Sequence, residues 1–272
     1  MEPLLLTGHR GYLGACVAAV LTRVGVPHRV LATRLQEIAP ASLDVSGVIH
    51  CAGPLRHRGD AVQMDGHCDG TRALLRGLTR PVPVVYVSSR SIYGRASAEL
   101  LNETVLAAPV DAYGGAKLAA EVSIHESGAP HVILRCSTLI GMGVDQDGHS
   151  FLRQALHRLR AGETVTRYLP DRPHDALDVW AAAQACVEVS QSVHGNETFN
   201  LAGPARSLHA TLDALSTACG ALNRLRDKPD PSASWGVLDG SRFRDRYPTW
   251  QPRTDAALFG AWVAGLRLSA GS

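Results

Sequence analysis

The chain of 272 residues carries 27 Lys and Arg against 25 Asp and Glu, a formal net charge of +2 with no basic run. This balance argues against a nucleic-acid partner, and no apolar stretch approaches the ~20 residues that cross a membrane. The six cysteines show no CxxC spacing and the 12 histidines no HxxxH or HExxH pattern, so we expect no metal site. Because the first residues also lack the basic start of a signal peptide, we expect a cytoplasmic protein with reduced thiols.

Short apolar runs alternate with helical stretches along the first half, a pattern that predicts a doubly wound parallel α/β sheet. The expected strands lie at Leu4–Thr7, His28–Thr33, Gly47–Cys51, Val82–Ser88 and His131–Cys136. The expected helices lie at Tyr12–Val24, Asp60–Leu78 and Ala112–Glu126. The second and third strands are so close in sequence that their crossover helix must be short or absent.

Beyond Thr138 the rhythm changes, and loops rich in Gly and Pro interrupt the helical patterns. These patterns lie at Ser150–Arg160, Val179–Val189, Leu208–Ala221 and Asp255–Leu266, with a short strand at Thr198–Leu201. We predict a main domain over residues 1–138 with returning segments near 176–203. A smaller C-terminal α/β lobe over 139–175 and 204–272 would then lie at the carboxyl edge of the sheet, where open α/β folds bind ligands.

Three glycines at equal spacing follow the first strand and precede the first helix: Gly8, Gly11 and Gly14. In a Rossmann-type turn the first allows the tight turn, the second lets the backbone approach a pyrophosphate, and the third lets helix and strand pack closely. The pyrophosphate would then lie on N–H groups at the helix N-terminus, beside Tyr12 and Leu13. The turn predicts a dinucleotide site.

Tyr113 and Lys117 are four residues apart and share one face of an expected helix. A nearby ammonium favours the phenolate, so the phenol becomes a proton donor and acceptor near neutral pH. Ser89, at the end of an expected strand, can add a hydrogen bond to the same substrate oxygen. This trio is what reversible carbonyl reduction requires once a hydride source lies beside it.

Together these motifs resemble the extended short-chain dehydrogenase/reductase family, in particular its nucleotide-sugar-modifying members. Further matching segments are Val48–Gly53, Gly70-Thr71, Ser88–Gly94, Val132–Arg135, Phe199–Gly203, Leu238–Ser241 and Trp250–Pro252. The resemblance implies that Ser89, Tyr113 and Lys117 are catalytic, and that the protein is a homodimer. It implies cofactor contacts from Tyr113, Lys117, Cys51, Ala52, Gly53 and Cys136 in addition to the glycine turn.

The second strand ends Leu31-Ala32-Thr33-Arg34, without the acid that usually binds the adenosine ribose of NAD. Arg10 lies in the glycine turn, and two guanidinium groups at Arg10 and Arg34 suit a 2′-phosphate. The Gly-His-Arg-Gly turn and the Thr-Arg strand end resemble NADP-dependent GDP-fucose synthases. We therefore predict NADP (NADPH) as the cofactor.

Candidate substrate contacts come from two regions. Arg90 and Tyr93 flank Ser89, and His67 stands where relatives have an Asn at a helix start. In the second lobe Arg172 and Arg226, with Arg167 and Lys228 near them in sequence, could neutralise a diphosphate. Cys136 and Ile140 also depart from the family's Pro and Tyr, so the substrate pocket is expected to differ in shape.

The residues directly after Ser89 differ between family members that catalyse different reactions. Family 4,6-dehydratases have an Asp-Glu pair in this segment, and GDP-fucose synthases have a cysteine directly after the serine, whereas this chain has Arg90 and Ser91. The prediction is therefore NADPH-dependent reduction of a keto group, at C4, of a nucleotide-linked deoxysugar. A 4-epimerase with tightly bound NAD, a reductase of a non-sugar ketone and a non-catalytic NADP-binding redox sensor remain open.

Overall fold

The computed structural model describes residues 2–53, 61–95, 99–144, 150–193, 195–230, 236–252 and 262, with the backbone alone for 61–67. Its main sheet has six parallel strands in the order β10-β6-β4-β3-β1-β2. These strands are β1 (Leu4–Thr7), β2 (His28–Val30), β3 (Gly47–His50), β4 (Val84–Ser89), β6 (His131–Cys136) and β10 (Asn196–Leu201). The predicted doubly wound parallel sheet is confirmed.

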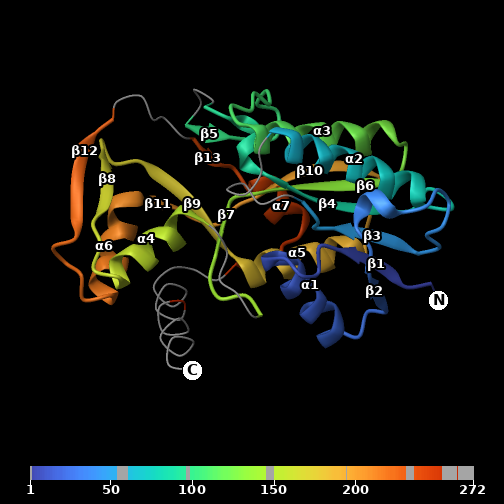
Figure 1. The fold of residues 1–272 in the computed structure, drawn as a ribbon, viewed down its shortest axis with the longest axis horizontal. Coiled ribbons are helices and arrows are strands. Elements are labelled where there is room, and N and C mark those ends of the chain that lie inside the picture. Colours follow the sequence, from blue (N-terminus) through green and yellow to red (C-terminus); the bar gives the residue numbers. More distant parts are fainter. Residues whose placement is uncertain are drawn as a thin grey trace.

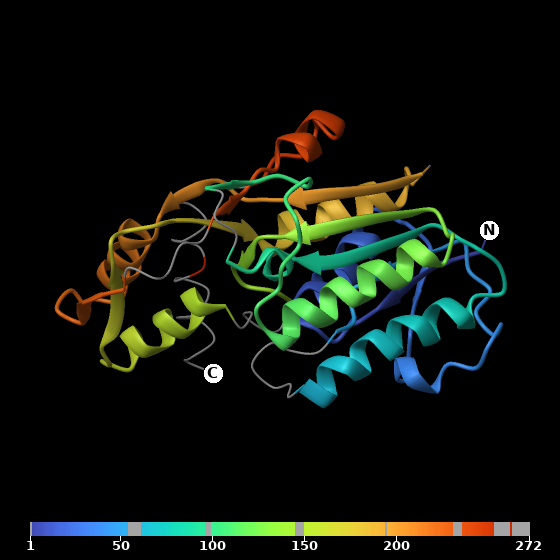
Figure 2. The same ribbon diagram turned by 90° about the horizontal axis from the view of Figure 1, so that it is seen from above.

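Two helical layers cover this sheet, as Figures 1 and 2 show. Helices α2 (Ala61–Gly77) and α3 (Ala112–Glu126) pack on one face, and α1 (Tyr12–Arg23) and α5 (Val179–Ser190) on the other. Strand β4 shows why both layers are needed, because five of its six residues are buried. A strand buried on both faces is nearly continuously apolar, and this one reads Val-Val-Tyr-Val-Ser-Ser.

A second, smaller unit lies beyond the carboxyl ends of the main strands (Figure 1). Its three-stranded sheet has the order β11-β9-β7, from β7 (Thr138–Ile140), β9 (Pro173–Asp178) and β11 (Ala205–Ser207). Helices α4 (Phe151–Arg160) and α6 (Leu208–Ala218) and the pair β8 (Val165–Leu169) and β12 (Leu225–Pro229) complete it. Its own apolar core includes Leu156, Leu212 and Trp262.

Five short elements complete the described chain. They are η1 (Leu35–Glu37), between β2 and β3, and η2 (Arg90–Tyr93), β5 (Leu100–Leu101), β13 (Val237–Leu238) and α7 (Ser241–Arg246). Just past β10, Gly203 lies so close to β9 that a Cβ there would overlap the carbonyl oxygen of Ala176. The chain therefore passes between the units in close contact.

The structure differs from the sequence expectations in several places. Strand β4 begins at Val84 instead of Val82, and β10 begins at Asn196 instead of Thr198. Strand β2 ends at Val30 instead of Thr33, because its only neighbour β1 ends at Thr7 and the last bond runs from the Leu31 N–H to the Leu6 carbonyl, 2.9 Å. Helix α6 ends at Ala218 instead of Ala221, since Gly220 takes a φ of +67°. The short strands of the second unit were not expected.

The end of the described chain also departs from the expected division into domains. Phe243, Tyr247 and Trp250 pack in the core of the main sheet, with α1 and α5. The predicted assignment of all of 204–272 to the second lobe therefore does not hold for these residues. The expected helix at 255–266 lies outside the described residues except for Trp262. No helix in the described part of the chain has the length and apolarity needed to cross a membrane.

Candidate active site

The glycine turn joins β1 to α1 and packs against the end of β3. Gly8 has a φ of +73°, and a Cβ there would lie 2.5 Å from the backbone nitrogen of Ala52. A Cβ at Gly14 would overlap the carbonyl oxygen of Gly8, whereas Gly11 donates its N–H to that oxygen at 2.8 Å. A side chain at Gly8 or Gly14 would therefore force the turn apart, which explains why glycine stands at both.

The first turn of α1 is built without a side-chain cap. Gly11 is the N-cap, makes no capping bond and is followed by no acid in the first turn. Such a helix start presents backbone N–H groups and a partial positive charge, so it fits a diphosphate. Leu13 is buried, so only its backbone faces this site. The Tyr12 hydroxyl donates to the Gly141 carbonyl at 2.5 Å and ties the turn to the segment after β7.

The two arginines expected to select the cofactor lie at the same edge of the sheet. Arg10 is in the turn after β1, Arg34 follows the neighbouring strand β2, and both are exposed. Arg34 is the residue before η1, where its own N–H donates to the Glu37 carboxylate at 3.2 Å. No acid follows β2 before Glu37.

The predicted catalytic trio comes from α3 and β4. Lys117 is buried, its Nζ lies 5.9 Å from the centroid of the Tyr113 ring, and it donates to the Val87 carbonyl at 2.9 Å. Val87 is two residues before Ser89, so the lysine fastens α3 to the strand that carries the serine. Burial lowers the pKa of Lys117 from 10.5 to about 8. The ammonium form therefore dominates at neutral pH.

Ser89 ends β4 and is half-buried. Its Oγ accepts the Ser91 N–H at 3.2 Å, which leaves the hydroxyl hydrogen to donate to a ligand. On the neighbouring strand β6, Cys136 is in register with Ser89. The structure thus places Cys136 beside the serine, buried, and burial raises its thiol pKa to about 12. Cys51 is half-buried at the turn after β3, next to the glycine turn.

The start of α3 is pressed against the turn that follows Ser89. Asp111 is the N-cap, and its carboxylate accepts the Gly114 N–H at 2.7 Å. A Cβ at Gly114 would lie 2.5 Å from the carbonyl oxygen of Ser91, whereas Gly115 has nothing within 4 Å. The absence of a side chain at Gly114 sets how closely Tyr113 and Ser89 approach.

Tyr93 was expected to line the sugar pocket, and the structure corrects this. Its side chain is fully buried, its hydroxyl donates to Asn200 at 2.8 Å, and Arg135 donates to the same hydroxyl at 2.9 Å. Arg135 also pairs with Glu121 at 2.8 Å, and Glu121 accepts from Ser88. Tyr93 therefore belongs to a buried polar network that fixes the far end of η2.

Arg90 was also expected to contact substrate, but its guanidinium already binds groups of the protein. It pairs with Asp175 in β9 at 3.0 Å and donates to the Gly236 carbonyl. The other oxygen of Asp175 accepts the Leu238 N–H at 3.0 Å. Arg90 therefore joins η2 to the second unit.

A buried histidine that sequence analysis did not single out lies below the glycine turn. His50 Nδ1 is 2.6 Å from the Thr7 hydroxyl and its Nε2 is 3.1 Å from the Thr71 hydroxyl. Burial, with a smaller contribution from Lys117, lowers the pKa of His50 to about 3. The Thr7 hydroxyl also accepts the Ala52 N–H at 3.2 Å. The sequence signal that could have singled out His50 is its place at the end of the buried strand β3, directly after Val48 and Ile49.

The remaining substrate candidates are spread over the second unit. Arg172, at the loop before β9, donates to the Asp230 carbonyl. Arg226, on β12, donates to the carbonyls of Asn223 and Leu225, both at 3.3 Å. Arg167 pairs with Asp213 and Asp227. The side chain of His67 lies outside the described residues, and within the described part no group of three His, Cys, Asp or Glu side chains is arranged for a metal.

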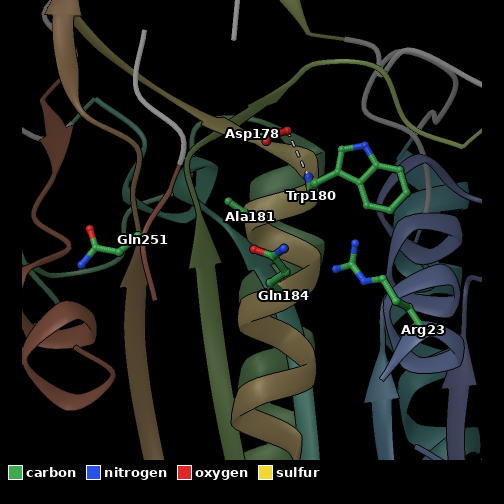
Figure 3. Close-up of a pocket in the computed structure, with 6 residues that line it drawn as sticks. All are labelled: Arg23, Asp178, Trp180, Ala181, Gln184 and Gln251. Atoms are coloured by element: carbon green, nitrogen blue, oxygen red, sulfur yellow. Dashed lines mark hydrogen bonds between the residues drawn. The ribbon is translucent and has the colours of Figure 1, made fainter. Parts of the chain in front are cut away.

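A cavity of about 240 Å³ opens between α1 and α5, on the face of the main sheet opposite α3. Figure 3 shows its lining, with the Trp180 indole near the Arg23 guanidinium. Asp178 caps α5 by accepting the Trp180 N–H at 3.1 Å, and the indole donates to the Met142 carbonyl at 2.8 Å. The cavity is separate from the catalytic trio.

A glycine turn at the switch point of a parallel sheet, combined with a tyrosine and a buried lysine one turn apart on α3, is typical of the short-chain dehydrogenase/reductase class of α/β protein. The chain belongs to the NAD dependent epimerase/dehydratase family, whose model matches residues 4–202, well over half of its length. The expected membership of the extended branch of that class is confirmed.

Named relatives agree with this family. The UDP-glucose 4-epimerase of Azospirillum brasilense is 28% identical over 174 residues, 51% of this chain and 49% of that protein. The chain therefore spans about half the length of this curated relative. The Thermotoga maritima UDP-glucose 4-epimerase structure with UDP-glucose has a TM-score of 0.82 at 18% identity, covering 98% of this chain and 99% of that one. RMD from Pseudomonas aeruginosa complexed with NADPH has a TM-score of 0.76 at 22% identity, covering 97% of both. At these identities the two structures establish the fold.

Proposed function

We propose that this protein reduces a keto group at C4 of a nucleotide-linked deoxysugar with NADPH. The observation that carries the proposal is the Lys117–Val87 hydrogen bond, which fastens Tyr113 on α3 to the strand that ends in Ser89. The trio thus forms a proton-transfer group at the carboxyl edge of the sheet, the edge at which α1 also begins without a side-chain cap. The likeness to the family's nucleotide-sugar enzymes supports the substrate class, and reduction at C4 is part of the proposal.

Each residue of the trio has a distinct role in this proposal. Ser89 donates its hydroxyl hydrogen to the substrate oxygen, and Tyr113 transfers a proton to the same oxygen as negative charge develops there. Lys117 remains cationic at neutral pH, with a pKa of about 8, and its charge favours the phenolate of Tyr113 once the proton has left. When bound, the nicotinamide supplies the hydride.

The described residues fit a dinucleotide. The helix start at Gly11 has no capping side chain to displace, and Gly8 and Gly14 bring the turn close to β3. The exposed Arg10 and Arg34 favour NADP, because guanidinium groups hold a 2′-phosphate by charge-assisted hydrogen bonds. Cys51, Ala52, Gly53 and Cys136 remain proposed cofactor contacts, and Arg172, Arg226 and His67 remain proposed substrate contacts.

A nucleotide-sugar 4-epimerase is the second candidate, favoured by the likeness to the Azospirillum brasilense UDP-glucose 4-epimerase. The same trio serves it, because epimerisation at C4 oxidises and then reduces one carbon. The two functions differ in the cofactor, which an epimerase retains as NAD. The redox-sensor alternative is disfavoured by the complete trio. The expected homodimer and cytoplasmic location stay predictions.

The deciding experiment identifies the dinucleotide released from purified protein and then measures NADPH and NADH affinity of the emptied protein. Arg10→Ala/Arg34→Ala is expected to weaken NADPH binding by about 100-fold, the value of one or two charge-assisted hydrogen bonds. NADH binding is expected to stay the same. Arg29→Ala, which removes another exposed arginine of β2, is the control.

The substrate is tested with UDP-, dTDP- and GDP-linked 4-keto-6-deoxyglucose, and with UDP-glucose for epimerisation. Freely exchanging NADPH with reduction of one of the ketones supports the proposal. Retained NAD with interconversion of UDP-glucose and UDP-galactose would replace it with the epimerase. Dinucleotide binding without turnover of any of these compounds would leave the non-sugar ketone reductase and the sensor.

A further inference from the structure

Arg90 follows the catalytic serine directly and reaches out of the main unit. Its guanidinium pairs with Asp175 Oδ1 at 3.0 Å and donates to the Gly236 carbonyl. Asp175 Oδ2 accepts the Leu238 N–H at 3.0 Å. One residue therefore links the turn after Ser89 to β9 and to β13, two separate strands.

Asp175 is buried, Arg90 is half-buried, and both carboxylate oxygens are hydrogen-bonded. The Asp175 side chain is 0% exposed and that of Arg90 18%, and both carboxylate oxygens have partners. Buried pairs of this kind add little net stability over apolar residues of the same volume, because desolvation offsets the attraction. What they supply is a defined geometry, so the question is which geometry this pair fixes.

The turn η2 has two ends, and they are held differently. Its far end is fixed within the main unit by the Tyr93 hydroxyl, through Asn200 and Arg135. Its near end, beside Ser89, is fixed to the second unit by Arg90. Between them the Ser91 N–H donates to Ser89 Oγ at 3.2 Å, so the path of the turn determines where the serine hydroxyl lies.

We propose that Arg90, held by Asp175, is a positioning residue that sets the Ser89 hydroxyl relative to the second unit. A substrate bound by that unit then presents its oxygen to Ser89 and Tyr113 together. This inference rests on the proposed function for its kinetic part, and on the geometry of the ligand-free protein for its structural part.

The test uses Arg90→Met, Arg90→Lys and Asp175→Asn. Each is made in the wild-type protein and in a Ser89→Ala variant. Arg158→Met is the control, since it removes the exposed ion pair between Arg158 on α4 and Glu163 in the loop that follows. Two properties are measured: hydrogen exchange of the Ser91 amide in ligand-free protein, and kcat and KM with the nucleotide-linked sugar that the wild type converts. If Arg90→Met does not fold, Arg90→Met/Asp175→Leu replaces it, since that variant leaves no unpaired buried charge.

Faster exchange at Ser91 is expected in Arg90→Met and Asp175→Asn, with Arg158→Met like the wild type. Because misplacement by about 1 Å can cost roughly 100-fold in rate, kcat is expected to fall by that order while KM changes little. Arg90→Lys should recover part of the rate, since it keeps the charge but not the fork that reaches both partners. In the Ser89→Ala background the Arg90 substitutions should cost almost nothing further.

Unchanged Ser91 exchange, an effect on KM alone, or losses that add fully to that of Ser89→Ala would each overturn the inference. A wild type that converts none of the sugars would refute the proposed function instead. In that case the exchange measurement still decides whether Arg90 positions the turn.

Discussion

Gly114 offers the sharpest test of how Tyr113 and Ser89 are held together. A Cβ at this position would lie 2.5 Å from the Ser91 carbonyl oxygen and 3.0 Å from Pro109 Cβ, whereas ordinary contact begins near 3.4 Å. In Gly114→Ala the start of α3 and the turn after Ser89 must therefore separate by about 0.9 Å. Both neighbours are constrained, the turn by Arg90 and Tyr93 and the helix by Lys117.

A displacement of this size between two groups that act on one oxygen is expected to lower kcat by roughly 100-fold. NADPH affinity should change little, because the glycine turn is untouched. Gly115→Ala is the matched control, since nothing lies within 4 Å of its Cβ. Alanine in place of a helical glycine is itself stabilising by about 1 kcal/mol, so Gly115→Ala should raise the melting temperature and keep the activity.

The assay is steady-state turnover of both variants, with NADPH binding and thermal unfolding measured in parallel. The reasoning is refuted if Gly114→Ala keeps wild-type kcat, or if the two alanine variants lose activity equally. A loss of NADPH binding in Gly114→Ala would place the effect in the cofactor site and would equally contradict it.

Three further outcomes are expected. Tyr113→Phe should lower kcat by about 10²–10⁴-fold through loss of the proton donor. The exposed-tyrosine variant Tyr168→Phe is the control, and near-normal turnover in Tyr113→Phe would reject its role. Lys117→Met should be more stable than the wild type at pH 7, because the Lys117 pKa falls from 10.5 in the unfolded chain to about 8 in the folded protein. The wild type gains stability as the pH rises from 8 to 10.5, so the difference in melting temperature between the two proteins should shrink over that range. A constant difference would exclude burial of the charged lysine as the cause. The pKa of His50 is 6.5 in the unfolded chain and about 3 in the folded protein, so the folded protein loses stability as the pH falls from 6.5 toward 3. Urea unfolding of His50→Gln should therefore depend less on pH in that range than unfolding of the wild type, and an equal dependence would show that His50 does not contribute.

Local sequence signals predicted the main sheet and the places in the fold of the segments proposed to be catalytic. The bounds of strands β1, β3 and β6 were predicted within one residue, because an apolar run bounded by Gly and polar residues can be recognised from a few neighbouring positions. The glycine turn and the Tyr–Lys pair were predictable for the same reason, since each lies within seven residues or fewer.

Contacts between distant segments were not predictable. Arg90 and Asp175 are 85 residues apart, and neither sequence neighbourhood indicates the other. Tyr93 was assigned to the pocket by its nearness to Ser89, but its partner Asn200 is 107 residues away. Strands β8 and β12 carry many polar residues because they form an exposed pair, so they show no clean alternation.

The passage of the chain between its two units bears on how such a protein can change its substrate. The polypeptide leaves the main sheet after β6, returns through α5 and β10, leaves again past Gly203, and is back in the main core at Trp250. Trp262 then lies in the core of the second unit. No single cut therefore separates the two units, and a fragment ending near residue 204 would leave a hole where Phe243 and Trp250 pack. A contiguous C-terminal piece exchanged for that of a relative would therefore bring part of the main core with it. Substitutions, or exchange of individual loops within the second unit, leave that core intact.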